Sequence, residues 1–297
     1  METIGVIGIG TIGWPMAGHL VRAGYPLRAH DADRERAQRF AAEFGTTLPA
    51  SPAELADASV ILTMLPTGAV VREVLTAGGA AALAANLRPG SIVIDTTSSE
   101  PAGTRELGAL LARWGVHLVD ASVSGGLAGA VAADLVFMMG GDDEGALARA
   151  ERVLAVLGKR IFRMGGLGAG NAMKAMNNLV SCAGFAAACE AVILGQRYGL
   201  DPAAMMTVLN ASTGRNFTTE NNLQKIVARR FEGSFALGLF AKDLGIAAAM
   251  ADAKGVAAPM SHLVHRLMME ARDAVGGERD HTAAFLHWER TADTPRD

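Results

Sequence analysis

The first strand and the turn after it constrain the fold more than any other part of the chain. Residues 3–7 form an apolar run rich in β-branched side chains, and Gly8, Gly10 and Gly13 follow as a helical pattern begins. Gly8 permits a tight turn, Gly10 lets the backbone approach a pyrophosphate, and Gly13 lets helix and strand pack closely. The positive end of the helix then faces the phosphates. The pattern predicts a dinucleotide-binding unit. Its expected cofactor contacts are Gly8, Ile9, Gly10, Thr11, Ile12 and Gly13.

The end of the second apolar stretch bears on the choice of cofactor. Residues 25–30 are followed directly by Asp31, which lies 18 residues after Gly13. A carboxylate there can accept hydrogen bonds from a ribose diol, and it would repel a 2′-phosphate. We therefore expect NAD as the preferred cofactor. NADP is the alternative, because Arg34 and Arg36 are near enough to compensate, although ion pairing with acidic neighbours is the simpler interpretation of both arginines.

Composition excludes several classes of protein. The chain has 297 residues, a formal net charge of −3 and an isoelectric point near 6.2, which predicts neither nucleic-acid binding nor attraction to an anionic membrane. Cys182 and Cys189 are seven residues apart in one helical pattern, too far for a disulfide. Free buried thiols, with a first strand that leaves no room for a signal peptide, lead us to expect a cytoplasmic protein.

Two further features argue against a membrane span and a metal site. The most apolar long stretch, residues 179–195, contains Glu190 and many alanines, which favours a buried helix. His262 and His265 are three apart on one helix, but no cysteine or paired carboxylate completes a metal site. We expect neither a membrane segment nor a bound metal.

The amino-terminal part has the pattern of an α/β fold. Residues 1–163 alternate apolar strands with helical segments, which predicts a Rossmann-type, doubly wound parallel sheet covered on both faces. The expected strands are 3–7, 26–30, 59–64, 91–95, 116–120 and 135–140. The expected helices are 14–23, 33–43, 52–56, 68–75, 102–113 and 143–156. Ligands bind at the carboxyl ends of the strands in such folds, so the chemistry should gather along one edge.

The remaining residues, 164–297, predict an all-α domain for substrate binding and oligomerisation. No convincing alternating strand follows the glycines of 165–170. The expected helices are 169–197, 202–211, 218–230, 240–254, 259–275 and 281–290, punctuated by glycines and by Asp201-Pro202. The large apolar helical surface favours a homodimer or homotetramer.

Six ordered motifs span nearly the whole chain. They are residues 8–17 (GIGTIGWPMA), 64–66 (MLP), 95–101 (DTTSSEP), 120–126 (DASVSGG), 168–178 (GAGNAMKAMNN) and 235–244. In this order they resemble the β-hydroxyacid dehydrogenases, the family of 3-hydroxyisobutyrate dehydrogenase and tartronate semialdehyde reductase. The resemblance implies NAD(P)-dependent interconversion of a small β-hydroxy acid and its semialdehyde.

The resemblance also implies roles for single residues. Lys174 would be the catalytic lysine and Asn178 the neighbour that orients the substrate. The remaining substrate contacts would be Ser124, Gly125, Gly126, Asn177 and Asp243. Further cofactor contacts would be Met64, Leu65, Pro66, Ser98 and Lys242. Departures from the family pattern are Ser122 for proline, Ala133-Asp134 for glycine-threonine and Thr97 for serine. Asp134 would reshape the entry to the substrate pocket.

The chemistry of the residues agrees with these roles. A lysine in a partly desolvated groove can give a proton to a developing alkoxide and take it back in the reverse reaction. Lys174 and Asn178 are four apart and therefore share a helix face. Blander interpretations stay open: a snorkelling lysine at 174, an ordinary loop at 124–126 and an exposed charge pair at Lys242-Asp243.

Other residues and functions also remain open at this point. Asp95 and Asp120 are interpreted as turn-capping residues, and Arg215 as a substrate contact, an interface contact or a solvated arginine. The alternative functions are a related reductase acting on a sulfonated aldehyde, an aryl β-hydroxy amino acid or an imine, and a dinucleotide-binding module without catalysis.

Overall fold

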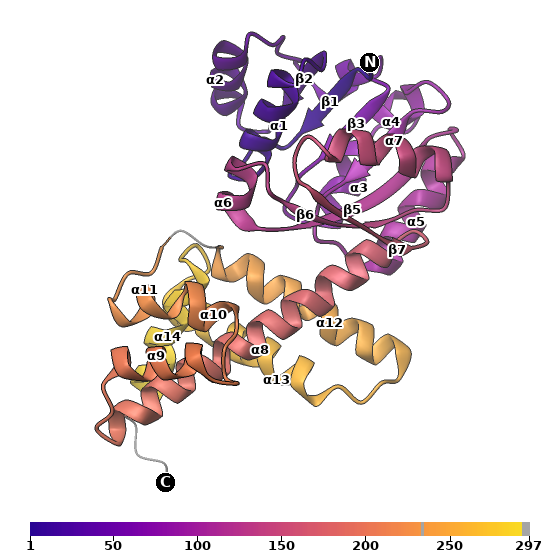
Figure 1. Cartoon of the computed structure of the whole chain (residues 1–297). Coiled ribbons are helices and arrows are strands. Elements are labelled where there is room, and N and C mark those ends of the chain that lie inside the picture. Colours follow the sequence, from indigo (N-terminus) through magenta and orange to yellow (C-terminus); the bar gives the residue numbers. More distant parts are fainter. Residues whose placement is uncertain (233–234, 293–297) are drawn as a thin grey trace. The chain divides into compact units, whose positions relative to one another are not determined.

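The chain divides into two compact units. The computed structural model describes residues 1–232 and 235–292 (Figure 1). The amino-terminal unit is Met1–Lys174 and the carboxyl-terminal unit is Ala175–Asp297. One helix, α8 (Ala169–Arg197), begins in the first unit and continues into the second.

The amino-terminal unit is built on one sheet. Within the described residues it has seven strands in the order β2-β1-β3-β4-β5-β6-β7. Their bounds are β1 Ile4–Ile7, β2 Leu27–His30, β3 Val60–Thr63, β4 Ile92–Asp95, β5 His117–Ser124, β6 Val136–Gly140 and β7 Arg160–Gly165. β1 to β5 are parallel, with β1 between β2 and β3. The strand order reverses at β1, as it does in doubly wound folds, and the mostly parallel sheet confirms the predicted fold class.

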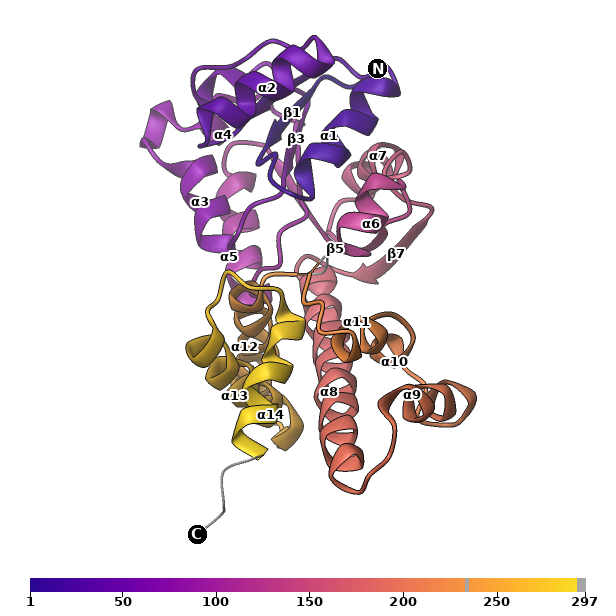
Figure 2. The ribbon, with the colours of Figure 1, turned by 90° about the vertical axis from the view of Figure 1, so that its left-hand side faces the viewer.

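Helices cover both faces of the sheet (Figures 1 and 2). The α-helices of this unit are α1 Gly13–Arg22, α2 Arg34–Phe44, α3 Gly68–Thr76, α4 Leu83–Asn86, α5 Pro101–Ala112, α6 Gly126–Val131 and α7 Glu144–Leu154. Two short 3₁₀ helices are η1 Pro52–Leu55 and η2 Gly79–Ala81. Several helices begin where the sequence supplies a capping side chain: Asp33, Thr67 and Asp143 each accept a backbone N–H of the first turn.

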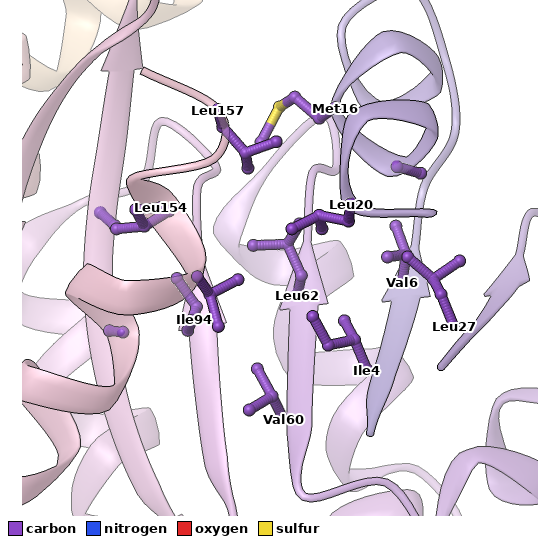
Figure 3. Close-up of a cluster of buried hydrophobic side chains, with 14 of the residues drawn as sticks. Ile4, Val6, Met16, Leu20, Leu27, Val60, Leu62, Ile94, Leu154 and Leu157 are labelled. Atoms are coloured by element: carbon purple, nitrogen blue, oxygen red, sulfur yellow. The ribbon is translucent and has the colours of Figure 1, made fainter. Parts of the chain in front are cut away.

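The strands alternate their side chains between two apolar cores. Val60 and Leu62 of β3 lie in the core that includes Met16 and Leu20 of α1 and Leu154 of α7 (Figure 3). The intervening Ile61 lies in the opposite core, which is formed with residues of α3, α4 and α5. Both faces of each central strand are therefore buried, which explains why these strands are continuous apolar runs rather than alternating ones.

The far edge of the sheet differs from the prediction in two ways. β6 runs antiparallel to β5, and β7 runs parallel to β6. The sheet is therefore not wholly parallel: residues 125–135, which contain only the short helix α6, return the chain antiparallel to β5. β7 was not predicted as a strand because its sequence carries two arginines and no buried apolar run. In the structure its side chains are mostly exposed. The expected boundary between residues 163 and 164 lies inside β7.

At the amino-terminal ends of the strands, one guanidinium group hydrogen-bonds to the segments before three of them. Arg149 Nε of α7 donates to Glu2 Oε1 at 2.8 Å, and its Nη2 donates to Glu2 Oε2 at 3.0 Å and to Ser59 O at 3.2 Å. Its Nη1 donates to Gly90 O at 2.6 Å. These partners lie just before β1, β3 and β4. The side-chain hydrogen bond from Arg149 lowers the pKa of Glu2 to about 2.

The carboxyl-terminal unit is helical throughout its described residues. After α8 it contains α9 Pro202–Ala211, α10 Phe217–Asn221, α11 Leu223–Val227, α12 Leu237–Lys254, α13 Pro259–Val275, η3 His281–Ala283 and α14 Ala284–Ala292. The predicted bounds of α8, α9 and α13 are confirmed. The single helix expected at 218–230 is two helices, and the start of the helix expected at 240 lies earlier, at Leu237.

α8 is long and apolar enough to cross a membrane by length and composition. Within the carboxyl-terminal unit, however, its Cys182, Phe185, Cys189 and Val192 are buried in the helical core. Both cysteines are free, as predicted, and burial raises the pKa of Cys182 to about 12. The composition of this helix is that of a core helix, as expected from Glu190 and its many alanines.

Candidate active site

The parallel strands end at one level, so the segments that follow them lie along one edge. Ile7 of β1 pairs with His30 and Thr63, Thr63 with Asp95, and Asp95 with Asp120. β5 continues beyond that level to Ser124, where it pairs only with β6. The predicted gathering of motifs at this edge is confirmed within the amino-terminal unit.

The three glycines of the first turn have different surroundings. Gly8 has a φ of +94°, and a Cβ there would overlap the carbonyl oxygen of Met64. A Cβ at Gly13, the first residue of α1, would overlap the carbonyl oxygen of Gly8. A Cβ at Gly10 would have no heavy atom within 4 Å. Gly8 and Gly13 are therefore needed by the turn itself, whereas Gly10 faces open space beside the start of a helix. Open space at the start of a helix is the position at which dinucleotide-binding turns in general bind a pyrophosphate.

Asp31 is tied to that turn. Its Oδ2 accepts the N–H of Ile9 at 2.9 Å, and its Oδ1 accepts the N–H of Asp33 at 2.8 Å. Arg36 Nη1 lies 3.2 Å from the same Oδ1, and Arg36 Nη2 lies 3.2 Å from Asp33 Oδ2. The carboxylate can accept further bonds, since its two oxygens offer about four acceptor positions. Arg36 therefore pairs with acidic neighbours, in accordance with the simpler interpretation of this arginine.

The segments after β3 and β4 are joined by hydroxyl groups. Thr97 Oγ1 accepts the N–H of Leu65 at 3.1 Å, and Thr96 Oγ1 donates to Thr63 O at 2.6 Å. Thr97 thus retains the hydroxyl of the serine that the family pattern has at this position. Of the other predicted cofactor contacts, Met64 and Ser98 are half-buried and Pro66 is exposed.

Two buried carboxylates lie beneath this edge. Asp95 Oδ1 accepts from Thr63 Oγ1 at 2.8 Å and from the N–H of Thr97 at 3.0 Å, which confirms its turn-capping role. Burial raises the pKa of Asp95 to about 6. Burial also raises the pKa of Asp120. The local turn expected of Asp120 is wrong, because its carboxylate caps the distant start of α8 instead, through Gly168 and Asn171.

The predicted substrate loop leads into a short helix. Ser124 is the last residue of β5, Gly125 has a φ of +128°, and Gly126, the first residue of α6, has a φ of +58°. Ser124 is half-buried and both glycines are exposed. Small residues with positive φ leave backbone N–H groups accessible to a carboxylate.

The start of α8 carries Lys174, which is half-buried and is the last residue of the amino-terminal unit. Three residues earlier, Asn171 is 1% exposed. Asp120 holds this end of the helix on β5, whose neighbours carry the other strand-end segments. Lys174 therefore belongs to the same unit and the same sheet edge as the dinucleotide turn.

In the carboxyl-terminal unit a second polar group links α8 to α12. Asn178 Nδ2 donates to Asp243 Oδ2 at 3.0 Å, and Lys242 Nζ lies 2.8 Å from Asp243 Oδ1. Asn177 Nδ2 donates to Asn178 Oδ1 at 3.4 Å. The Asp243 side chain is 3% exposed and that of Lys242 is 30% exposed. The charge pair is therefore largely buried, unlike the exposed pair that the blander interpretation assumed.

Known proteins match this chain over nearly its whole length. Residues 3–166 match the family described as the NAD-binding domain of 6-phosphogluconate dehydrogenase, and residues 168–288 match the family described as NAD-binding of NADP-dependent 3-hydroxyisobutyrate dehydrogenase. L-threonate dehydrogenase of Cupriavidus necator is 37% identical over 96% of this chain and 95% of its own length. The chain belongs to the β-hydroxyacid dehydrogenase family. It is an NAD(P)-dependent oxidoreductase of hydroxy acids, as the motifs predicted.

Two other members of the family agree with that assignment. 2-(Hydroxymethyl)glutarate dehydrogenase of Eubacterium barkeri is 32% identical over 97% of this chain and 95% of its own length. The solved structure of 3-hydroxyisobutyrate dehydrogenase of Mycobacterium tuberculosis with L-serine is 34% identical, with a TM-score of 0.88 over 97% of this chain and 99% of that one.

Some residues singled out in this dehydrogenase lie in surface ion pairs. Arg215 is 65% exposed and its Nε lies 3.6 Å from Glu220 Oε1. Asp134 is 54% exposed and its Oδ2 lies 3.4 Å from Arg160 Nη2. His262 Nε2 lies 3.2 Å from Asp252 Oδ1, and no group of three or more metal-ligating side chains occurs among the residues described.

Sequence reasoning missed the buried amide of Asn171 and its partners. Its Nδ2 donates to Ser122 Oγ at 2.8 Å and to Thr97 O at 3.2 Å, and its Oδ1 accepts from Thr104 Oγ1 at 2.7 Å. The available signal was the polar Asn171 in a run of small residues, together with the departure from the family pattern at Ser122.

Proposed function

We propose that this dehydrogenase interconverts a small β-hydroxy acid and its semialdehyde, with Lys174 as the general acid and base. The observation that carries the proposal is the place of Lys174: it lies half-buried in the second turn of a helix held at the strand edge that also carries the dinucleotide turn. A lysine at such a site can exchange a proton with the reacting oxygen.

The division of labour follows from the chemistry. The bound nicotinamide supplies or accepts the hydride. Lys174 Nζ gives its proton to the oxygen of the semialdehyde in reduction and takes it from the hydroxyl in oxidation, and the ammonium stabilises the developing charge. Asn177 and Asn178 orient the substrate with Asp243, and Lys242 contacts the cofactor, by the family pattern. Supporting these last roles is the chain of contacts that joins the four residues.

The substrate carboxylate is proposed to bind at Ser124, Gly125 and Gly126. A hydroxyl group and accessible backbone N–H groups suit an anion. The names of the relatives agree, since threonate, 2-(hydroxymethyl)glutarate and 3-hydroxyisobutyrate are all hydroxy acids. The solved relative was obtained with L-serine, which also has a carboxylate and a β-hydroxyl.

NAD is the proposed preferred cofactor. Asp31 presents a carboxylate beside the dinucleotide turn, and its Arg36 partner already pairs with Asp31 and Asp33. A 2′-phosphate would meet that carboxylate and would have to draw Arg36 away from both acids. The kcat/KM with NADH and NADPH decides the matter; a clear advantage of NADPH would refute the preference.

A homodimer or homotetramer in the cytoplasm is also proposed. Val180, Ala187 and Leu194 are spaced by seven on α8 and are exposed, Val180 by 73% and Leu194 by 56%. An apolar stripe on a long helix suits packing against a second copy. Sedimentation of Val180→Lys tests this: the variant should dissociate, and an unchanged assembly would place the interface elsewhere.

The decisive experiment is turnover of Lys174→Ala on a panel of β-hydroxy acids, semialdehydes, sulfonated aldehydes and cyclic imines. We expect kcat on the preferred hydroxy acid to fall by about 10²–10⁴-fold, with the Kd of NADH nearly unchanged. Lys159→Ala, which removes an exposed lysine of the same unit, is the matched control. Unaltered turnover in Lys174→Ala would remove Lys174 from the mechanism.

A further inference from the structure

The first turn of α8 is held on the sheet by its backbone. Four N–H groups at the start of a helix have no partner within it. Here Asp120 Oδ1 accepts the N–H of Gly168 at 2.7 Å, and Asp120 Oδ2 accepts the N–H of Asn171 at 2.8 Å. Asp120 is fully buried in the middle of β5. These bonds set where the helix starts.

The packing leaves no room for the helix to settle elsewhere. A Cβ at Gly170 would lie 2.8 Å from Asp120 Oδ2 and would overlap the carbonyl oxygen of Met138. A Cβ at Gly140 would lie 2.6 Å from Asp120 Oδ1 and 2.7 Å from Gly166 O. The backbone of α8 therefore rests directly on β5 and β6. Because only the Gly170 face of the helix can approach Met138 so closely, these contacts also limit rotation about the helix axis.

The side chain of Asn171 adds a second constraint on the rotation of the helix. Its buried amide bonds to Thr104 in α5, to the backbone of Thr97 after β4, and to Ser122 in β5. The three partners come from α5, from the segment after β4 and from β5. Asn171 thus makes three of the four hydrogen bonds that an amide can make.

We propose that Asn171, held by Ser122, is a positioning residue that sets the orientation of Lys174 for proton transfer. The inference rests on the proposed function of Lys174. Residues three apart lie on neighbouring positions of one helix face, so what orients Asn171 also orients Lys174. A rotation of α8 by about 10° moves a side-chain end by about 1 Å, given a helix radius of about 5–6 Å with side chains. Displacements of about 1 Å cost up to about 10²-fold in rate.

The bond from Asn171 to Ser122 is a feature of this chain rather than of the family pattern. Proline, the usual residue at position 122 in that pattern, has no hydroxyl to offer an amide. Ser122 is fully buried and its Oγ accepts from Asn171 Nδ2 at 2.8 Å. The substitution therefore adds a directed contact between β5 and the helix that carries the proposed proton donor.

The test is Ser122→Ala, which removes one hydroxyl and leaves the rest of the group in place. We expect kcat to fall by about 5- to 30-fold, while the Kd of NADH and the KM of the hydroxy acid change by less than about twofold. Ser122→Thr keeps the hydroxyl and should restore most of kcat. Asn171→Ala should show a larger loss of kcat. If Asn171→Ala does not fold, Ser122→Ala alone still tests the proposal.

Ser59→Ala is the control for a merely structural role. Ser59 Oγ makes a hydrogen bond to Glu2 at 2.5 Å at the other end of the strands, outside the proposed machinery. Ser59→Ala should lower Tm about as much as Ser122→Ala does, but it should leave kcat within about twofold of the unmodified enzyme. A kcat of Ser122→Ala that also stays within twofold would overturn the positioning role.

The double variant separates this inference from the proposed function. If Ser122 acts through Lys174, adding Ser122→Ala to Lys174→Ala should cause no further loss of kcat. An equal loss in both backgrounds would overturn the inference while leaving the role of Lys174 standing. Full turnover of Lys174→Ala alone would refute the proposed function and, with it, this inference.

Discussion

The structure predicts opposite consequences for replacing Gly10 and Gly13 with alanine, in accordance with the different roles that their positions in the motif predict. A Cβ at Gly10 meets no heavy atom within 4 Å, whereas a Cβ at Gly13 overlaps the oxygen of Gly8 and lies 3.0 Å from its carbonyl carbon. Gly10→Ala should therefore fold normally and lose cofactor, and Gly13→Ala should be unstable.

The magnitudes follow from these surroundings. Gly10→Ala should leave the free energy of unfolding unchanged or raise it by about 0.4–1 kcal/mol, because alanine restricts the unfolded chain. Pushing the pyrophosphate away costs one charge-assisted hydrogen bond, about 1.5–3 kcal/mol, which raises the Kd of NADH by about 10- to 150-fold. Gly13→Ala should lower the free energy of unfolding by about 1–3 kcal/mol, as overpacking of a tight contact does.

Denaturant titration and NADH fluorescence measure the two quantities independently. The expected pattern is normal stability with weak binding for Gly10→Ala, and low stability for Gly13→Ala. An unchanged Kd in Gly10→Ala would show that the turn does not approach the pyrophosphate there. Equal destabilisation of both variants would refute the inference that a Cβ at Gly10 fits without a clash.

Three further predictions concern stability, each measured by denaturant titration. Ala133 has a φ of +50°, a conformation that costs a residue with a Cβ about 1–2 kcal/mol, so Ala133→Gly should raise the free energy of unfolding by about 0.5–1 kcal/mol. The control Ala132→Gly, at a φ of −81°, should lower it. A lower free energy of unfolding in Ala133→Gly would contradict this. The pKa of Glu2 is lowered from 4.5 to about 2, so its pairing with Arg149 contributes up to about 3 kcal/mol to the free energy of unfolding above pH 4.5, and this contribution is lost as pH falls through 2. The loss of stability in Arg149→Met relative to the unmodified protein should therefore shrink between pH 4.5 and pH 2. A loss that does not change with pH would argue against the ion pair. The pKa of Asp95 is raised from 3.8 to about 6, so this residue reduces stability by up to about 3 kcal/mol as pH rises from 4 to 6; Asp95→Asn should lack that decline, and an identical pH profile would refute it.

Much of the fold could be predicted because local patterns determine it. The buried strands β1 to β4 are continuous apolar runs, and Asp201 accepts the N–H of Ala204 to begin α9 where the sequence places Asp-Pro. β7 could not be found this way, since an exposed edge strand carrying Arg160 and Arg163 has neither a buried run nor a clear alternation. The direction of β6 is not specified by the composition of the strand.

The candidate site divides along the same line. The glycine turn, Asp31 and Lys174 stand in local motifs and were predicted from them. The group around Asn171 joins residues 49 to 74 positions apart, and no periodicity connects such residues. Asp120 was misinterpreted for the same reason: a carboxylate that caps a helix 48 residues away has the same local sequence as one that caps its own turn.

The guanidinium of Arg149 has a consequence for biosynthesis. Because it joins Glu2 to residues at the starts of β3 and β4, Glu2 acquires this partner only after a further 147 residues have been synthesised. A nascent chain that stops before residue 149 can pair β1 with β2 and β3, but the carboxylate of Glu2 then lacks its arginine partner. We therefore expect protease resistance of truncated nascent chains to rise sharply once α7 has left the ribosome.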